Sequence, residues 1–169
     1  IKIAHLADLT GAIKDANKFQ IEGMDIALSE VNTPTAKYKI TIDRQDTGAD
    51  PAKALALMKD VAATSDYVLQ IGPPSSTEFF AAIPQAEKLK MPILSMVAGG
   101  YYNGTFNQYI FRTSFPDTSA MPALIDYAKT KLNAKSLGSV YANDSDSPRT
   151  NGEQMAKMAT AKGIKTTSY

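Results

Sequence analysis

The chain has 169 residues, a net charge of +1 and an apolar fraction of 44%, which is enough to build a substantial core. Its Lys and Arg residues are scattered, which argues against a nucleic-acid or anionic-membrane surface. Because the chain has no cysteine, disulfides, thiolate chemistry and cysteine-ligated zinc are excluded, and no segment reaches the about 20 apolar residues of a membrane span.

The first two thirds of the chain alternate between strand and helix patterns. Short apolar or alternating runs indicate strands, and apolar residues at 3.6-residue spacing indicate helices. Asp50-Pro51 marks one helix start, because it combines a preferred N-cap with a proline at the first helical position. The predicted strands cover residues 1–7, 38–42, 67–71, 91–95 and 109–113, and the predicted helices cover 12–31, 52–63 and 76–89. This order predicts an α/β fold with an open, doubly wound parallel sheet and helices on both faces.

The pattern changes close to Pro116. A helix over residues 119–132, a strand over 137–141, a helix from Ser147-Pro148 to about 162 and the start of a further strand follow. Two strands are too few for an independently stable sheet, and their unpaired edges favour self-association. We therefore expect residues 1–116 to form one lobe and residues 117–169 to form part of a second, incomplete α/β lobe. The chain begins at Ile1 without an initiator Met, which suggests a processed or trimmed N-terminus.

Residues 67–78 form the stretch most suggestive of a binding site. An apolar strand ends at Gly72-Pro73-Pro74, because prolines cannot continue a ladder of strand hydrogen bonds. Ser75 followed by Glu78 is a capping-box pattern that opens a helix. The free N–H groups and the positive dipole of a helix N-terminus favour an anion. Ser76 offers both an N–H and a hydroxyl to a carboxylate, although plain capping without a ligand explains the two serines equally well.

Other candidate residues follow the predicted strands. Ligands of an open parallel sheet bind beyond the carboxyl ends of its strands, and the segments there are rich in Gly and small hydroxyl residues. Among them, Asp46 is expected to close a turn through its own backbone rather than to shape a site. Tyr101 and Tyr102 follow Gly99-Gly100, so they could cover a ligand with a flat apolar face or simply pack their loop.

The sequence argues against an enzyme. It has none of the Gly-rich phosphate-binding patterns of nucleotide-binding proteins and no G-x-S-x-G nucleophile elbow. Its single histidine, His5, lies inside the first predicted strand, where a hydrogen-bonded core histidine is expected. One histidine without a tight acidic cluster builds neither a catalytic triad nor a metal site. We therefore expect no catalytic residue, no cofactor and no metal.

Several short motifs follow one another along the chain. They are Leu9-Thr10-Gly11, Gly23-Met24-Asp25-Ile26-Ala27 with Glu30-Val31-Asn32, Asp46 with Asp50-Pro51-Ala52-Lys53-Ala54, Ile71-Gly72-Pro73-Pro74-Ser75-Ser76, Pro92-Ile93-Leu94-Ser95, and Phe111-Arg112-Thr113. Each motif alone is weak, but together they cover essentially the whole chain. In this order they resemble the motifs of the type I periplasmic solute-binding proteins of ABC transporters, in particular those of the branched-chain amino-acid (Leu/Ile/Val) binding group.

The resemblance implies two α/β lobes that close like a hinge over a small carboxylate-bearing solute. It implies that the present chain covers the N-terminal lobe and only the opening part of the second. It also implies a periplasmic or extracellular location after removal of a signal peptide, and a membrane permease of an ABC importer as partner. A ligand-sensing domain of the same fold, in a receptor or regulator, is the alternative function.

The resemblance also implies where the solute binds. In amino-acid binders the solute carboxylate lies on the serine turn and on the small-residue loop after the fourth strand. Gly99 stands where these proteins usually carry a Thr or Ser hydroxyl, so either an amino acid or an aromatic acid that Tyr101 or Tyr102 could stack on fits the resemblance. The candidate ligand contacts are Ser75, Ser76, Val97, Ala98, Gly99, Tyr101 and Thr10.

Overall fold

The structure, a computed structural model, describes residues 1–64, 66–96, 98–102, 104–143 and 145–168. Contacts within the chain divide it into two compact units. Unit 1 consists of Ile1–Val97 and Phe106–Thr113, and unit 2 consists of Ala98–Thr105 and Ser114–Tyr169. The short segment 98–105 therefore groups with the C-terminal part of the chain. The boundary expected near Pro116 stays a prediction.

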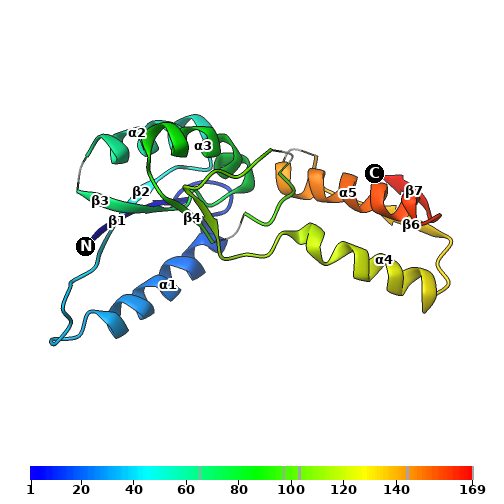
Figure 1. Ribbon diagram of the computed structural model, residues 1–169, viewed down its shortest axis with the longest axis horizontal. Coiled ribbons are helices and arrows are strands. Elements are labelled where there is room, and N and C mark those ends of the chain that lie inside the picture. Colours follow the sequence, from blue (N-terminus) through cyan, green and yellow to red (C-terminus); the bar gives the residue numbers. More distant parts are fainter. Residues whose placement is uncertain (65, 97, 103, 144, 169) are drawn as a thin grey trace. The chain divides into compact units, whose positions relative to one another are not determined.

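Unit 1 is built on a five-stranded parallel sheet of order β2-β1-β3-β4-β5. Its elements are β1 (Lys2–Ala7), α1 (Lys14–Val31), β2 (Thr41–Asp46), α2 (Pro51–Ala63), β3 (Tyr67–Ile71), α3 (Ser76–Leu89), β4 (Ile93–Ser95) and β5 (Ile110–Arg112). Helices α2 and α3 pack together on one face of the sheet, and α1 lies on the other (Figure 1). This arrangement confirms the predicted open, doubly wound α/β fold.

Strand β2 lies further along the chain than the sequence predicted. The alternation that begins at Tyr38 predicted a strand over residues 38–42, whereas Thr41–Asp46 pair residue by residue with Lys2–Ala7 of β1. Tyr38 stays outside the strand and is exposed. The pairing with β1, not the local alternation, sets the position of β2. Because β2 lies at the edge of the sheet, it tolerates the polar residues Asp43, Arg44 and Gln45, which are only half-buried.

The two faces of the sheet in unit 1 are covered unequally. Helix α3 alone buries six side chains, among them Phe79 and Ile83, whereas α1 buries only Asn17 and Met24. A groove of about 250 Å³ separates part of α1 from Ile71 and its apolar neighbours on the sheet. Ile71 of β3 pairs with Leu94 of β4, and Leu94 pairs with Phe111 of β5. The Phe111 side chain is 53% exposed. On this side of the sheet Leu94 of β4 is therefore half-buried, and Phe111 of β5 is exposed.

Unit 2 is a small α/β unit with a core of its own. It contains a 3₁₀ turn (Asp117–Ser119), α4 (Met121–Thr130), β6 (Ser136–Ser139), α5 (Asp146–Ala161) and β7 (Lys165–Ser168). Strands β6 and β7 form a two-stranded parallel sheet, as the sequence predicted. The core consists of Met121, Ile125, Ala159 and Ile164. Among the residues that the structure describes, no helix has the length and apolarity to cross a membrane.

Candidate functional site

The serine turn follows directly on β3. Gly72 has φ +87°, and a Cβ at this position would lie 2.2 Å from the carbonyl oxygen of Leu6 in β1, so only glycine permits this approach. The hydroxyl of Ser75 then accepts a hydrogen bond from the Glu78 N–H at 3.1 Å. In return, Glu78 Oε2 accepts from the N–H and the hydroxyl of Ser75 at 3.2 and 2.6 Å. The predicted capping box is confirmed.

The capping box separates the roles of the two serines. The hydroxyl of Ser75 both accepts from and donates to Glu78, so the helix cap uses it fully. Ser76 is the first residue of α3 and is 7% exposed, and neither its N–H nor its hydroxyl bonds to another described residue. Of this pair, Ser76 therefore keeps the donors that a solute carboxylate requires.

Glu78 sets a limit on the anion affinity of this turn. Its side chain is fully buried in the first turn of α3, and its Oε1 has no hydrogen-bond partner among the described residues. A carboxylate in this position already compensates part of the positive helix end, so it opposes a second anion. Further contacts from elsewhere in the protein are needed to bind a carboxylate tightly at Ser76.

The loops after β1 and β2 are joined by Asp46. Its Oδ1 accepts from the N–H groups of Leu9 and Gly48 at 2.9 and 3.0 Å, and its Oδ2 accepts from the Thr10 hydroxyl at 2.7 Å and Lys53 Nζ at 3.2 Å. These bonds, that of Leu9 first, hold the pKa of the Asp46 carboxyl well below its usual range. The bond from Gly48 confirms the turn predicted for Asp46. The Thr10 hydroxyl uses its one O–H to donate a hydrogen bond to Asp46, so toward a solute it can accept but not donate.

Sequence reasoning missed the residues that shape the loop between β1 and α1. Asp8 is fully buried, and its carboxylate accepts from the N–H groups of Gly11 and Ile13 at 2.5 and 2.8 Å. The Asp8 N–H donates to Asn17 Oδ1 at 2.6 Å, which ties the loop to α1. The available signal was an aspartate between a buried strand and a helix, a position that favours binding of neighbouring backbone N–H groups.

The small-residue loop after β4 belongs largely to unit 2. Val97 lies outside the described residues, and Ala98 is fully buried. The carbonyl oxygen of Gly99 accepts from the Asp117 N–H at 2.9 Å. A Cβ at position 99 would lie 2.7 Å from Asp117 Oδ1, so the aspartate carboxylate fills the space of a side chain there.

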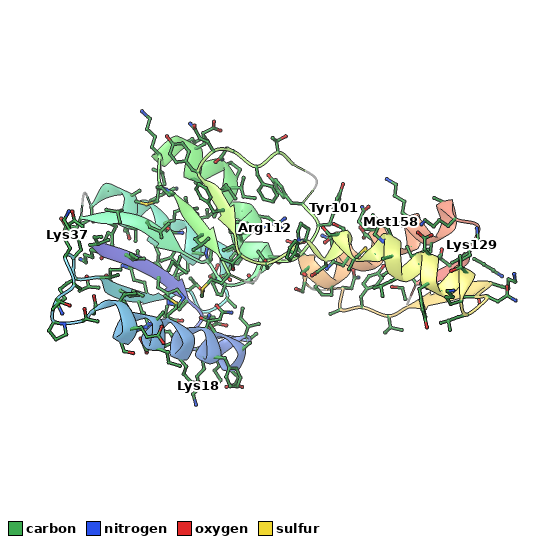
Figure 2. All side chains as sticks on the ribbon, turned by 60° about the horizontal axis from the view of Figure 1, so that its bottom comes forward. Lys18, Lys37, Tyr101, Arg112, Lys129 and Met158 are labelled. Carbon is green, nitrogen blue, oxygen red and sulfur yellow. The ribbon has the colours of Figure 1, made fainter. Side chains whose placement is uncertain are left out.

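The two tyrosines after this loop have different surroundings. The ring of Tyr102 packs over Gly104, where a Cβ would lie 2.4 Å from ring carbon Cζ. Tyr101 lies beside α5, where it lines a pocket of about 310 Å³ with Glu153 and Lys157 (Figure 2). Its N–H donates to Asn151 Oδ1 at 3.2 Å. Tyr102 therefore packs its own loop, and Tyr101 is the aromatic side chain that borders open space.

His5 is a core residue, as the sequence predicted, and is 1% exposed in β1. The expected hydrogen bond is not formed at its Nδ1, which has no partner among the described residues. Burial, with a smaller effect of the nearby Arg44 charge, lowers the pKa of His5 to about 4. Within the described parts of the chain, no group of three or more His, Cys, Asp or Glu residues could hold a metal ion.

Comparison with known proteins identifies the family. The family model described as periplasmic binding protein matches residues 1–168. The chain belongs to this family. The periplasmic binding proteins bind solutes and are not enzymes, which confirms the prediction of a non-enzymatic protein, and their type I fold is the one described above. No curated protein matches the chain.

Solved structures of periplasmic binding proteins share this fold. A leucine-binding protein from Thermotoga maritima has 21% identity and a TM-score of 0.82, over 100% of this chain and 48% of that chain. A solute-binding protein from Rhodopseudomonas palustris BisB5, in complex with 3,4-dihydroxybenzoic acid, has 21% identity and a TM-score of 0.85, over 99% and 46%. A branched-chain amino-acid binding protein from Streptococcus pneumoniae, in complex with isoleucine, has 21% identity and a TM-score of 0.74, over 100% and 49%. The chain thus spans about half the length of these proteins.

Proposed function

We propose that this chain is part of the extracytoplasmic solute-binding component of an ABC importer. It captures a small carboxylate-bearing solute, either an amino acid or an aromatic acid, and delivers it to a membrane permease. The family match supports the binding role. Similar folds in complex with isoleucine and with 3,4-dihydroxybenzoic acid support the two solute classes.

The observation that carries this proposal is that Ser76 keeps two unused hydrogen-bond donors. Its N–H and hydroxyl stand at the positive end of the 14-residue helix α3 without a partner among the described residues. Ser75 and Glu78 fix the turn and use their own donors in doing so. In this proposal Ser76 donates to the solute carboxylate, and Ser75 holds the turn in place.

The remaining candidate contacts have supporting roles. In this proposal Ala98, Gly99 and Tyr101 contribute further contacts to the solute, with the Tyr101 ring on an apolar part of it. Thr10 serves only as an acceptor, because its O–H already donates to Asp46.

Isothermal titration calorimetry of the intact protein with leucine, isoleucine, 4-hydroxybenzoate and 3,4-dihydroxybenzoate tests the proposal. At least one of these acids should bind, and Ser76→Ala should weaken its binding by about 1.5–3 kcal/mol, the range of a hydrogen bond to a charged group. Ser29→Ala is the matched control, since Ser29 is exposed on α1 and its hydroxyl only bonds the Ile26 carbonyl oxygen. Equal affinities of Ser76→Ala and the unchanged protein would refute the role of the serine turn.

A further inference from the structure

A histidine and an arginine lie side by side on the face of the sheet that α1 covers. His5 of β1 is directly opposite Arg44 of β2 in the parallel ladder, so both side chains project from the same face. Arg44 donates to Asp25 of α1, and Ile71, opposite His5 on β3, lines the groove beneath α1. Because His5 is 1% exposed and α2 and α3 lie on the other face, α1 is the helix that keeps water from its ring (Figure 1).

This pair of side chains has no place for a second positive charge. Nδ1 of His5 and Nε of Arg44 are buried without a hydrogen-bond partner among the described residues. Burial does most to keep the His5 ring neutral, the Arg44 charge adds to this effect, and the Asp25 charge opposes it. From β3, the residue opposite His5 is the apolar Ile71. A proton on His5 therefore places a buried positive charge beside Arg44, whose own charge Asp25 already neutralises.

Helix α1 is held to the sheet by few contacts. Two of its 18 residues are buried, Asn17 and Met24, whereas α3 on the other face buries six of 14. The ion pair between Asp25 and Arg44 adds little, because the Asp25 side chain is 55% exposed. Release of α1, with the sheet and the opposite helices intact, is therefore the least costly way to bring water to a charged His5.

We propose that His5 and Arg44 form an acid-sensitive switch under α1, in which a proton taken up by His5 releases the helix while the rest of unit 1 stays folded. At neutral pH the ring is uncharged and α1 stays in place. In acid, the charge beside Arg44 is stabilised where water reaches it, which requires α1 to leave the sheet. The inference does not rest on the proposed function, because the switch lies under α1 and involves no solute.

Amide hydrogen exchange at pH 7 and pH 5, corrected for the intrinsic effect of pH on exchange, tests the switch in the intact protein. His5 has a pKa of about 4 when α1 covers it and about 6.5 when α1 is released, so the opening equilibrium of α1 should rise about 20-fold over this range. Both pH values lie above the ordinary pKa of carboxyl groups, and His5 is the only histidine of the chain. Amides of α3 should show a lower opening equilibrium than those of α1 at both pH values.

Two variants separate the charge of His5 from the ion pair of α1. His5→Gln removes the titration, so the opening of α1 should change less than about threefold between pH 7 and pH 5. Asp25→Asn breaks the pair with Arg44, and it should raise the opening of α1 about threefold at pH 7 and keep the pH dependence. Glu22→Gln is the matched control and should change neither. Glu22 is 54% exposed against 55% for Asp25, but its ion pair is with Lys18 of α1 itself.

The possible results decide the inference in each case. Equal opening of α1 at both pH values would overturn it, and so would a pH dependence that His5→Gln retains. Equal opening of α1 and α3 would also overturn it, because acid then unfolds the whole unit. If His5→Gln does not fold by circular dichroism, the NMR signal of the single imidazole decides. That signal should remain that of a neutral ring down to pH 5, and a titration near pH 6.5 in the folded protein would show that the switch is wrong.

Discussion

Replacing Asp46 by Asn should loosen the two loops that this carboxylate joins. Asn keeps an oxygen that can accept from the N–H groups of Leu9 and Gly48. Its NH₂ group, however, replaces Oδ2, so the Thr10 hydroxyl loses its acceptor and Lys53 loses its ion pair. Lys53 is about half exposed, so its pair contributes little, and the loss is chiefly one hydrogen bond to a charged group. We expect unit 1 to lose about 1.5–2 kcal/mol at neutral pH.

Acid should abolish this difference. The pKa of Asp46 is lower in the folded protein than its ordinary value, so its contribution is complete above pH 4 and is lost as the pH falls through the folded pKa. Asp46→Asn lacks this titration, so the two proteins should converge in stability on acidification. Amide hydrogen exchange of Leu9 and Gly48, with urea unfolding at pH 7 and at low pH, measures the effect. Equal stabilities at pH 7, or a difference that acid leaves unchanged, would refute the role given to Asp46.

Two further changes test unit 1. Gly72→Ala should destabilise it by more than about 2 kcal/mol in urea unfolding, because φ +87° and the backbone of Leu6 both exclude a Cβ. A loss of stability under about 0.5 kcal/mol would contradict this geometry. His5 is neutral in the folded protein but takes up a proton more readily in the unfolded chain. The free energy of unfolding should therefore fall by about 1.4 kcal/mol for each pH unit as the pH is lowered from 6.5 to 4. His5→Gln should remove this part of the pH dependence, and an unchanged slope would show that His5 does not titrate in this way.

Local signals predicted the elements around the serine turn because the contacts that form them are local. The run from Tyr67 to Ile71 is a strand with the predicted bounds, and the Ser75–Glu78 pair spans one helical turn. Strand β2 was misplaced because its register depends on β1, which is distant in sequence. Its polar sequence after Ile42 gives no strand signal of its own.

Only part of the division of roles within the candidate site was predictable from the sequence. The spacing of Ser75 and Glu78 predicted the helix cap, but the structure was needed to show that the Ser75 hydroxyl both accepts from and donates to Glu78. The bond from Thr10 to Asp46 and that from Asn151 to Asp117 each cross more than 30 positions of sequence. The motifs that resemble the family include Thr10 and Asp46 but neither Asn151 nor Asp117, and they do not say which oxygen accepts each hydrogen bond.

The unequal covering of the sheet gives unit 1 a strong side and a weak side. Helices α2 and α3 share a well-packed layer with the sheet, so their amides should open only with the whole unit. Helix α1 buries only Asn17 and Met24, so it can detach locally at a lower free energy. Because Asn17 holds the Asp8 N–H, detachment of α1 also releases the loop that carries Thr10. The order of the loop that carries Thr10 therefore depends on how firmly α1 packs on the sheet.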